Sequence, residues 1–334
     1  MTLLSVPVID IAPFRSGILE TKAEVANRVA QACTDIGFLV ISGHGVDDEL
    51  IADMYRVTKE YFEGAPEAKL AVARPAAGQI RGYSGVEQEG LGLLEDQPAP
   101  PDLKESFDIG PLDVPTDDPY FRSEAAGAHF APNLWPAGVD DFEAVYRRYY
   151  HAMEQLTLEM FEIFATALDL PADFFVDTVD RHISILRSNY YPPQVTAPKV
   201  NQLRGGAHSD YTAMTILWQE EVEGGGLQVR NKAGDWVDVP VVPGTFVINL
   251  GDSLERWTND KWVSTMHRVI NPPANIASTQ SRVSIPYFVQ PNYDAVIECI
   301  KTCCDGKNPA KYGPIRNGDY LYMKFTQQNT LPTA

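Results

Sequence analysis

A histidine and an aspartate two positions apart, His208 and Asp210, are the residues of this 334-residue chain best spaced to hold a metal ion. No other histidine of the six has an acidic residue two positions after it. In a β-strand, side chains at i and i+2 point to the same face, so an imidazole and a carboxylate can converge on one ion. A third imidazole from another strand would complete a two-histidine, one-carboxylate set with open positions for substrate and dioxygen. His267, in a second strand-like run, is the candidate.

A second pair at the same spacing, Arg282 and Ser284, places a guanidinium fork beside a hydroxyl on one strand face. This combination suits a carboxylate bound through two parallel hydrogen bonds. The alternative is an arginine in a surface salt bridge. The β-branched and aromatic neighbours favour burial, and therefore a ligand-binding role.

Short runs rich in Val, Ile, Thr and aromatic residues carry or flank these five side chains. Gly and Pro clusters separate the runs, as turns between strands require. Many short strands at fairly regular spacing predict a sandwich or jelly roll. The predicted strands are Ile183–Tyr191, Ala213–Trp218, Leu227–Val229, Trp236–Val239, Thr245–Leu250, Met266–Ile270 and Arg282–Val289.

Apolar residues at helical spacing predict helices ahead of these strands. Thr21 and Glu24 have the spacing of a capping box that would open the first helix, and Gly37 would end it. The predicted elements are this helix, a buried strand at Phe38–Ile41, a helix from Asp47 or Asp48 to Phe62, a long helix from Asp140 to Leu168, and a helical tail after Pro291.

The segment from Ala73 to Pro136 is rich in Gly, Pro and acidic residues, which predicts a long irregular region with short ordered pieces. Long loops in compact proteins often cover binding sites, so the segment is a candidate substrate cover. A solvated connection without a function would have the same composition.

The composition is that of an ordinary soluble globular protein, with 44% hydrophobic and 22% charged residues. The net charge of −18 disfavours nucleic acids and anionic membranes as partners, because both would repel the chain. Neither a secretory signal nor a membrane-spanning stretch is visible, which predicts a cytoplasmic protein. We expect a monomer or weak homodimer.

The four cysteines, Cys33, Cys299, Cys303 and Cys304, do not have the spacing of a disulfide framework and are expected to be reduced. Cys299 and Cys303 could share one face of a helix and bind a metal ion together. A zinc site needs four ligands, however, and no histidine lies nearby in the sequence.

Taken together and in order, these motifs resemble the iron(II)- and 2-oxoglutarate-dependent dioxygenases of the isopenicillin-N-synthase-like family. The resemblance covers nearly the whole chain. Besides the blocks around His208, His267 and Arg282, it is carried by residues Val6–Ile11, Gly37–Val46, Asn189–Pro193, Gly225–Val229 and Asn249–Asp252.

The resemblance implies an α+β fold with a double-stranded β-helix core, also called a jelly-roll or cupin-like core, and flanking helices. Residues 1–110 would be an N-terminal helix and strand region packed on the core. Residues 111–180 would hold an irregular segment and the long supporting helix. Residues 181–334 would form the core and a C-terminal helical tail, and the three regions would make one structural unit.

The resemblance also implies roles for individual residues. His208, Asp210 and His267 would hold Fe(II). Arg282 and Ser284 would bind the distal carboxylate of 2-oxoglutarate, Tyr191 would donate a further hydrogen bond to it, and Asn189 would lie close by. Phe288 matches a position that often lines the substrate pocket, and position in the chain adds Leu217, Tyr83 and Phe107 as pocket candidates.

The implied reaction couples the decarboxylation of 2-oxoglutarate, with dioxygen, to the oxidation of a small organic substrate, and yields succinate and carbon dioxide. Hydroxylation of a heterocycle or a secondary metabolite is the expected outcome. Stretches at Lys104–Gly110 and Arg256–Asp260 are similar to those of microbial members, thymine hydroxylases included. Three alternatives remain open: an iron oxidase of the same fold that does not use 2-oxoglutarate, a catalytically silent metal- or ligand-binding barrel, and a zinc hydrolase.

Overall fold

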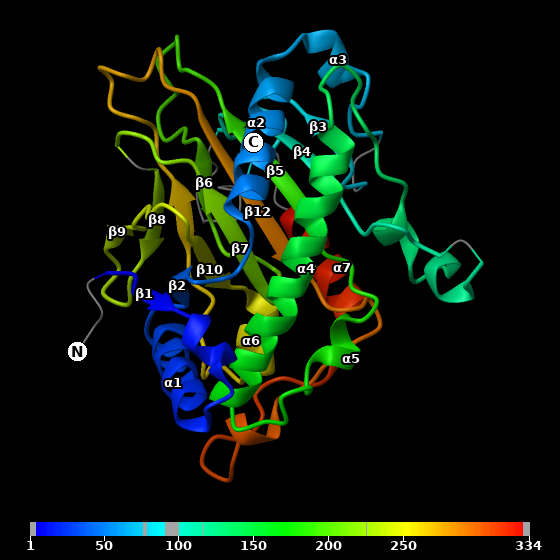
Figure 1. Cartoon of the computed structure of the whole chain (residues 1–334), viewed down its shortest axis with the longest axis vertical. Coiled ribbons are helices and arrows are strands. Elements are labelled where there is room, and N and C mark those ends of the chain that lie inside the picture. The colour runs from blue at the N-terminus through cyan, green and yellow to red at the C-terminus, as the bar shows by residue number, and fades with distance from the viewer. Residues whose placement is uncertain (1–4, 76–78, 91–99, 116, 225, 330–334) are drawn as a thin grey trace.

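Two sheets, packed face to face, form the centre of the computed structural model, which describes residues 5–75, 79–90, 100–115, 117–224 and 226–329 (Figure 1). All strand pairs are antiparallel except that of β1 with β2. The larger sheet has the order β1 (Val8–Asp10), β2 (Phe38–Ser42), β10 (Phe246–Leu250), β7 (Met214–Gln219), β12 (Arg282–Val289), β5 (Ile185–Tyr191), β4 (Glu105–Ile109) and β3 (Gly82–Ser84). The smaller sheet has the order β6 (Gly205–His208), β11 (His267–Val269), β8 (Leu227–Arg230) and β9 (Trp236–Asp238).

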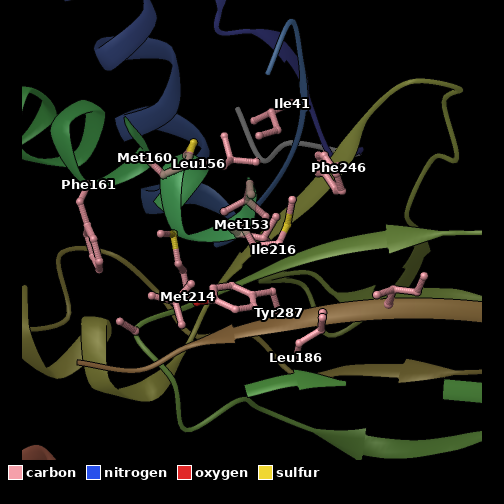
Figure 2. Close-up of a cluster of buried hydrophobic side chains, with 14 of the residues drawn as sticks. Ile41, Met153, Leu156, Met160, Phe161, Leu186, Met214, Ile216, Phe246 and Tyr287 are labelled. Carbon is pink, nitrogen blue, oxygen red and sulfur yellow. The ribbon is translucent and has the colours of Figure 1, made fainter. Parts of the chain in front are cut away.

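Three long helices cover the outer face of the larger sheet: α1 (Leu19–Asp35), α2 (Asp48–Glu63) and α4 (Phe142–Ala167) (Figure 1). The apolar stripe of α4 packs on the side chains that point outward from the sheet, at alternate positions along each strand. Figure 2 shows Met153, Leu156 and Met160 of α4 beside Ile216 of β7 and Tyr287 of β12. The helices thus bury one face of the sheet.

The inner face of the larger sheet packs on the smaller sheet. Strand β12 shows the division: Val283, Ile285 and Tyr287 belong to the core under the helices, whereas Arg282 and Ser284 line a cavity between the sheets. Because successive strand residues face opposite ways, a single strand supplies both the core and the cavity.

The remaining elements are short or terminal. The helices α3 (Pro66–Leu70), α5 (Val176–Val179) and α6 (Asp252–Trp257) are followed by a two-stranded sheet of β13 (Val296–Ile297) and β14 (Ile315–Arg316) and by the C-terminal helix α7 (Asn317–Asn329). No helix within the described ranges is long and apolar enough to cross a membrane.

The jelly-roll core with flanking helices and the seven predicted strands after residue 180 are confirmed, with ends that agree to within two residues. The second helix is also confirmed. It begins where predicted because the Asp47 side chain caps it by accepting a hydrogen bond from the Glu49 N–H. The predicted capping box is wrong. The first helix begins at Leu19, immediately after a left-handed turn at Gly17, so Thr21 lies inside it.

Within its described residues, the segment from Ala73 to Pro136 is largely irregular with short ordered pieces, as predicted, and two of those pieces, β3 and β4, form the edge of the larger sheet. One further expectation is wrong. Cys299 and Cys303 do not share a helix face: Cys299 follows β13, and Cys303 ends a short 3₁₀ turn that starts at Lys301. All four thiols are free.

Candidate active site

A cavity of about 220 Å³ lies between the two sheets and contains both polar pairs that the sequence singled out. His208 ends β6 and His267 begins β11, and the two are direct cross-strand partners. Asp210 follows two residues after His208. One ligand atom of each of these three residues lies within 4.8 Å of the others. The Asp210 Oδ1 is 3.6 Å from the Nε2 of His208 and 3.7 Å from that of His267.

Hydrogen bonds behind the three side chains orient them. The Nδ1 of His208 lies 2.8 Å from the Gly206 carbonyl and that of His267 lies 3.1 Å from the Thr265 carbonyl. Because a carbonyl can only accept, each Nδ1 carries the proton and each Nε2 presents a lone pair to the centre. Sequence spacing alone does not specify this tautomer.

The carboxylate of Asp210 is held in the same way. Its Oδ2 accepts hydrogen bonds from Thr215 (2.6 Å) and Asn249 (2.7 Å), which leaves Oδ1 toward the imidazoles. Burial alone would raise the pKa of Asp210, but the facing imidazoles and the two hydrogen bonds outweigh it and lower the pKa. Burial, followed by repulsion from His267, lowers the pKa of His208 to about 4. Near neutral pH the site is therefore an ionised carboxylate with a neutral His208, the protonation states that a divalent metal requires.

A buried arginine occupies another part of the cavity. Arg282 is 1% exposed, and its one side-chain hydrogen bond within the described chain, apart from a contact with Tyr191, runs from Nη2 to Gln219 (2.9 Å). Its Nε and Nη1 are buried without a partner in the described residues. Burial lowers the pKa of Arg282. Unpaired donors on a buried cation are rare, and here they suit a carboxylate.

The residues expected beside Arg282 are found there. Arg282 pairs with Tyr191 and Ser284 with Asn189 in the register of β12 with β5. The Ser284 hydroxyl is 3.4 Å from both the Asn189 amide nitrogen and the Tyr191 hydroxyl. The structure thus brings together all seven side chains predicted for iron and 2-oxoglutarate.

The predicted substrate-pocket residues divide into two groups. Phe288 and Leu217 line the cavity. Tyr83 and Phe107 do not, which corrects the prediction. Phe107 packs under the helices, among aromatic rings such as that of Tyr146, and the Tyr83 hydroxyl donates to Glu105.

A cluster of buried charged residues on the cavity wall was not predicted. Arg187, Asp108 and Lys104 line the cavity. Arg187 forms ion pairs with Asp108 (2.7 Å) and Glu89 (2.9 Å), and Lys104 with Glu89 (3.2 Å). The spacing held a usable signal, because Arg187 lies two residues before Asn189 and shares its strand face.

Family models match two parts of the chain. Residues 6–138 match "non-haem dioxygenase in morphine synthesis N-terminal" and residues 182–291 match the 2OG-Fe(II) oxygenase superfamily. A 2-oxoglutarate-Fe(II) type oxidoreductase of Emericella nidulans, hxnY, is 34% identical over 96% of this chain and 89% of its own length. The chain belongs to the 2OG-Fe(II) oxygenase superfamily.

Other members of the superfamily match over similar lengths. Homoarginine-6-hydroxylase 2-ODD-233 of Oryza sativa is 30% identical, with 96% of each chain covered. The crystal structure of a full-length Neurospora crassa protein in complex with alpha-KG and thymine is 30% identical and superposes with a TM-score of 0.83 over 96% of each chain. The chain is therefore an oxidoreductase that uses Fe(II), 2-oxoglutarate and dioxygen to oxidise a small molecule. The two histidines and the aspartate of this oxygenase fit Fe(II), and the buried guanidinium with unpaired donors fits 2-oxoglutarate.

Proposed function

We propose that His208, Asp210 and His267 are the iron ligands of this oxygenase. The observation that supports this most is that two imidazole Nε2 atoms and one carboxylate oxygen face each other, each fixed by a hydrogen bond on its other side. Two histidines and one carboxylate are the donor set of non-haem Fe(II) oxygenases. Bound iron with 2-oxoglutarate supplies the oxidising chemistry, and the protein supplies position and shelter.

We further propose that Arg282 binds the distal carboxylate of 2-oxoglutarate, with Ser284 and Tyr191 as hydroxyl donors and Asn189 beside them. The unpaired donor atoms of Arg282 support the assignment, since a carboxylate is a strong acceptor for a buried guanidinium and can bridge its two terminal nitrogens. The guanidinium would anchor the co-substrate at the end of the cavity where Tyr191 and Arg282 lie. The other end of the paired strands β5 and β12 would remain for the substrate.

The proposed reaction is hydroxylation of a small organic molecule, a heterocycle or a secondary metabolite. Phe288 supplies an aromatic face, Leu217 an apolar wall, and the cluster around Arg187 polar contacts. A ring with polar substituents matches this lining, and the thymine in the Neurospora crassa complex is a molecule of this kind. Residues of the cavity would hold one C–H bond toward the iron and exclude water.

The test is a substrate screen by succinate release, in which each candidate is assayed with and without 2-oxoglutarate. Succinate that requires 2-oxoglutarate, Fe(II) and one candidate substrate supports the proposal, and the oxidised product identifies the bond attacked. Oxygen consumption without succinate would indicate the 2-oxoglutarate-independent oxidase instead.

We also propose a cytoplasmic enzyme, monomeric or weakly dimeric, with no nucleic-acid partner. Light scattering on the purified enzyme over a range of concentrations measures the oligomeric state, and a stable tetramer would contradict this part.

A further inference from the structure

A segment far from the metal ligands in sequence lies along the chain that leads into β6. The Leu103 N–H donates to the Leu203 carbonyl (3.0 Å). The Gln202 amide donates to the Glu87 carboxylate (2.6 Å) and to the Pro101 carbonyl (3.0 Å). These bonds bring residues 87 and 101–103 against the start of the strand that ends in His208.

Asp102 makes the contact closest to the metal site. Its carboxylate is 1% exposed, and Oδ1 accepts the Gly206 N–H at 2.9 Å. The other oxygen accepts from the Lys104 ammonium, also at 2.9 Å. The Gly206 carbonyl in turn accepts the Nδ1 proton of His208 at 2.8 Å. Asp102 and His208 are therefore both hydrogen-bonded to Gly206.

Strand β6 needs such an outside contact. It has four residues and lies at the edge of the smaller sheet, so only one of its sides pairs with another strand. Its pairing with β11 shifts register between His267 and Val269. It also begins with Gly205 and Gly206, and glycine gives the backbone the greatest freedom. Sheet pairing alone therefore constrains the backbone before His208 weakly.

We propose that Asp102 is a positioning residue for the iron ligand His208, acting through the backbone of Gly206. It fixes the peptide whose carbonyl orients the imidazole, and the buried Lys104 ammonium holds the carboxylate in place. This inference rests on the proposed role of His208 in iron binding. It makes the segment before β4 a part of the metal centre, joined through Lys104 and Glu89 to the charged cluster on the cavity wall.

The experiment measures Mn(II) affinity of the metal-free enzyme by calorimetry. Substitutions behind a metal-ligating histidine typically weaken metal binding about 10- to 100-fold, and we expect that loss for Asp102→Ala. Asp102→Asn keeps an oxygen that can accept from Gly206 but turns a donor toward Lys104, so its loss of affinity should be smaller than that of Asp102→Ala. Asp108→Asn is the control, because it removes another buried carboxylate of the same charged cluster, one that is ion-paired with Arg74 and Arg187 instead of hydrogen-bonded to Gly206.

Equal Mn(II) affinity of Asp102→Ala and Asp108→Asn would overturn the proposal, even if both variants are less stable. Mn(II) binding that survives in the His208→Ala variant would instead contradict the metal site itself. Hydrogen exchange of the wild-type enzyme is a second measurement, in case Asp102→Ala does not fold. The Gly206 amide should be protected despite its position on an edge strand, and fast exchange at Gly206 would overturn the inference.

Discussion

Replacing Arg282 with methionine removes the guanidinium and leaves an apolar side chain of similar length. In the wild-type structure the guanidinium is fully buried, with two unpaired donor atoms. In the variant, the distal carboxylate of 2-oxoglutarate would enter a buried site without a counter-charge. We therefore expect a large, selective loss of affinity for 2-oxoglutarate.

The size of the loss follows from the kind of contact removed. Loss of one partner of a buried, hydrogen-bonded charge pair costs about 2–5 kcal/mol, and about 1.4 kcal/mol corresponds to a factor of ten. The KM for 2-oxoglutarate should rise roughly 30- to 4,000-fold in Arg282→Met. Ser284→Ala removes one neutral hydrogen bond, worth about 0.5–1.5 kcal/mol, so its KM should rise only about 2- to 12-fold.

The assay compares 2-oxoglutarate with 2-oxopentanoate, which lacks the distal carboxylate. Wild type should strongly prefer 2-oxoglutarate, and Arg282→Met should lose most of the preference. Without 2-oxoglutarate, the variant should not melt at a lower temperature, because the substitution removes a buried, unpaired charge. Arg268→Met is the control, since that guanidinium bonds to Gln228 on the other face of the smaller sheet. A preference for 2-oxoglutarate that survives in Arg282→Met would refute the assignment.

Three further predictions concern other parts of the site. His267→Ala should abolish iron-dependent turnover and calorimetric Mn(II) binding and leave the circular dichroism spectrum unchanged, whereas tight Mn(II) binding in this variant would contradict the ligand set. Phe288→Ala should raise the KM for the organic substrate at least about tenfold with little change in the KM for 2-oxoglutarate, whereas Tyr83→Phe should change neither KM. A larger effect of Tyr83→Phe than of Phe288→Ala on the KM for the organic substrate would place that substrate elsewhere. Burial alone would raise the pKa of Glu89, but the facing charges of Arg187, Lys104 and Arg74 outweigh it and hold the pKa below the usual value of 4.5. The ion pairs of Glu89 therefore stabilise the fold above pH 4.5, and this stabilisation is lost as the pH falls further. Urea unfolding of Glu89→Gln should show a loss of about 3 kcal/mol at pH 7 that shrinks toward pH 3, and a constant difference would exclude the ion pairs as its cause.

Alternation in the sequence was enough to predict most of the site. His208 with Asp210 and Arg282 with Ser284 lie at i and i+2, and each pair does face one cavity. For Arg282 and Ser284 the reason is the predicted one, because the period of two is a property of the extended backbone whatever the strand packs against. Asp210 lies beyond the end of β6, so strand alternation does not explain its position. Sequence could not specify which strands pair, and therefore that His267 faces His208.

Strand β4 was not predicted because it mixes charged, polar and apolar residues, as an exposed loop does. The pairing of Glu105 with Lys69 and of Asp108 with Arg187, which allows these charges to be buried, is invisible in the sequence. Without a predicted strand at β4, the sequence does not determine the face on which Phe107 lies. Phe107 faces the helices, and its neighbour Asp108 faces the cavity.

The pairing of β5 with β12 explains how one register serves both stability and catalysis. Tyr191 opposes Arg282, Asn189 opposes Ser284, and Ile185 opposes Phe288, so the cavity is ordered along two strands from the co-substrate end to the substrate end. A slip of one residue would turn Arg282 into the core under α4 and Val283 into the cavity. The interactions that maintain this register are mainly the apolar contacts of the opposite face, which includes Tyr287. Substitutions under the helices should therefore disturb the order of the site only when they disturb the pairing of these two strands.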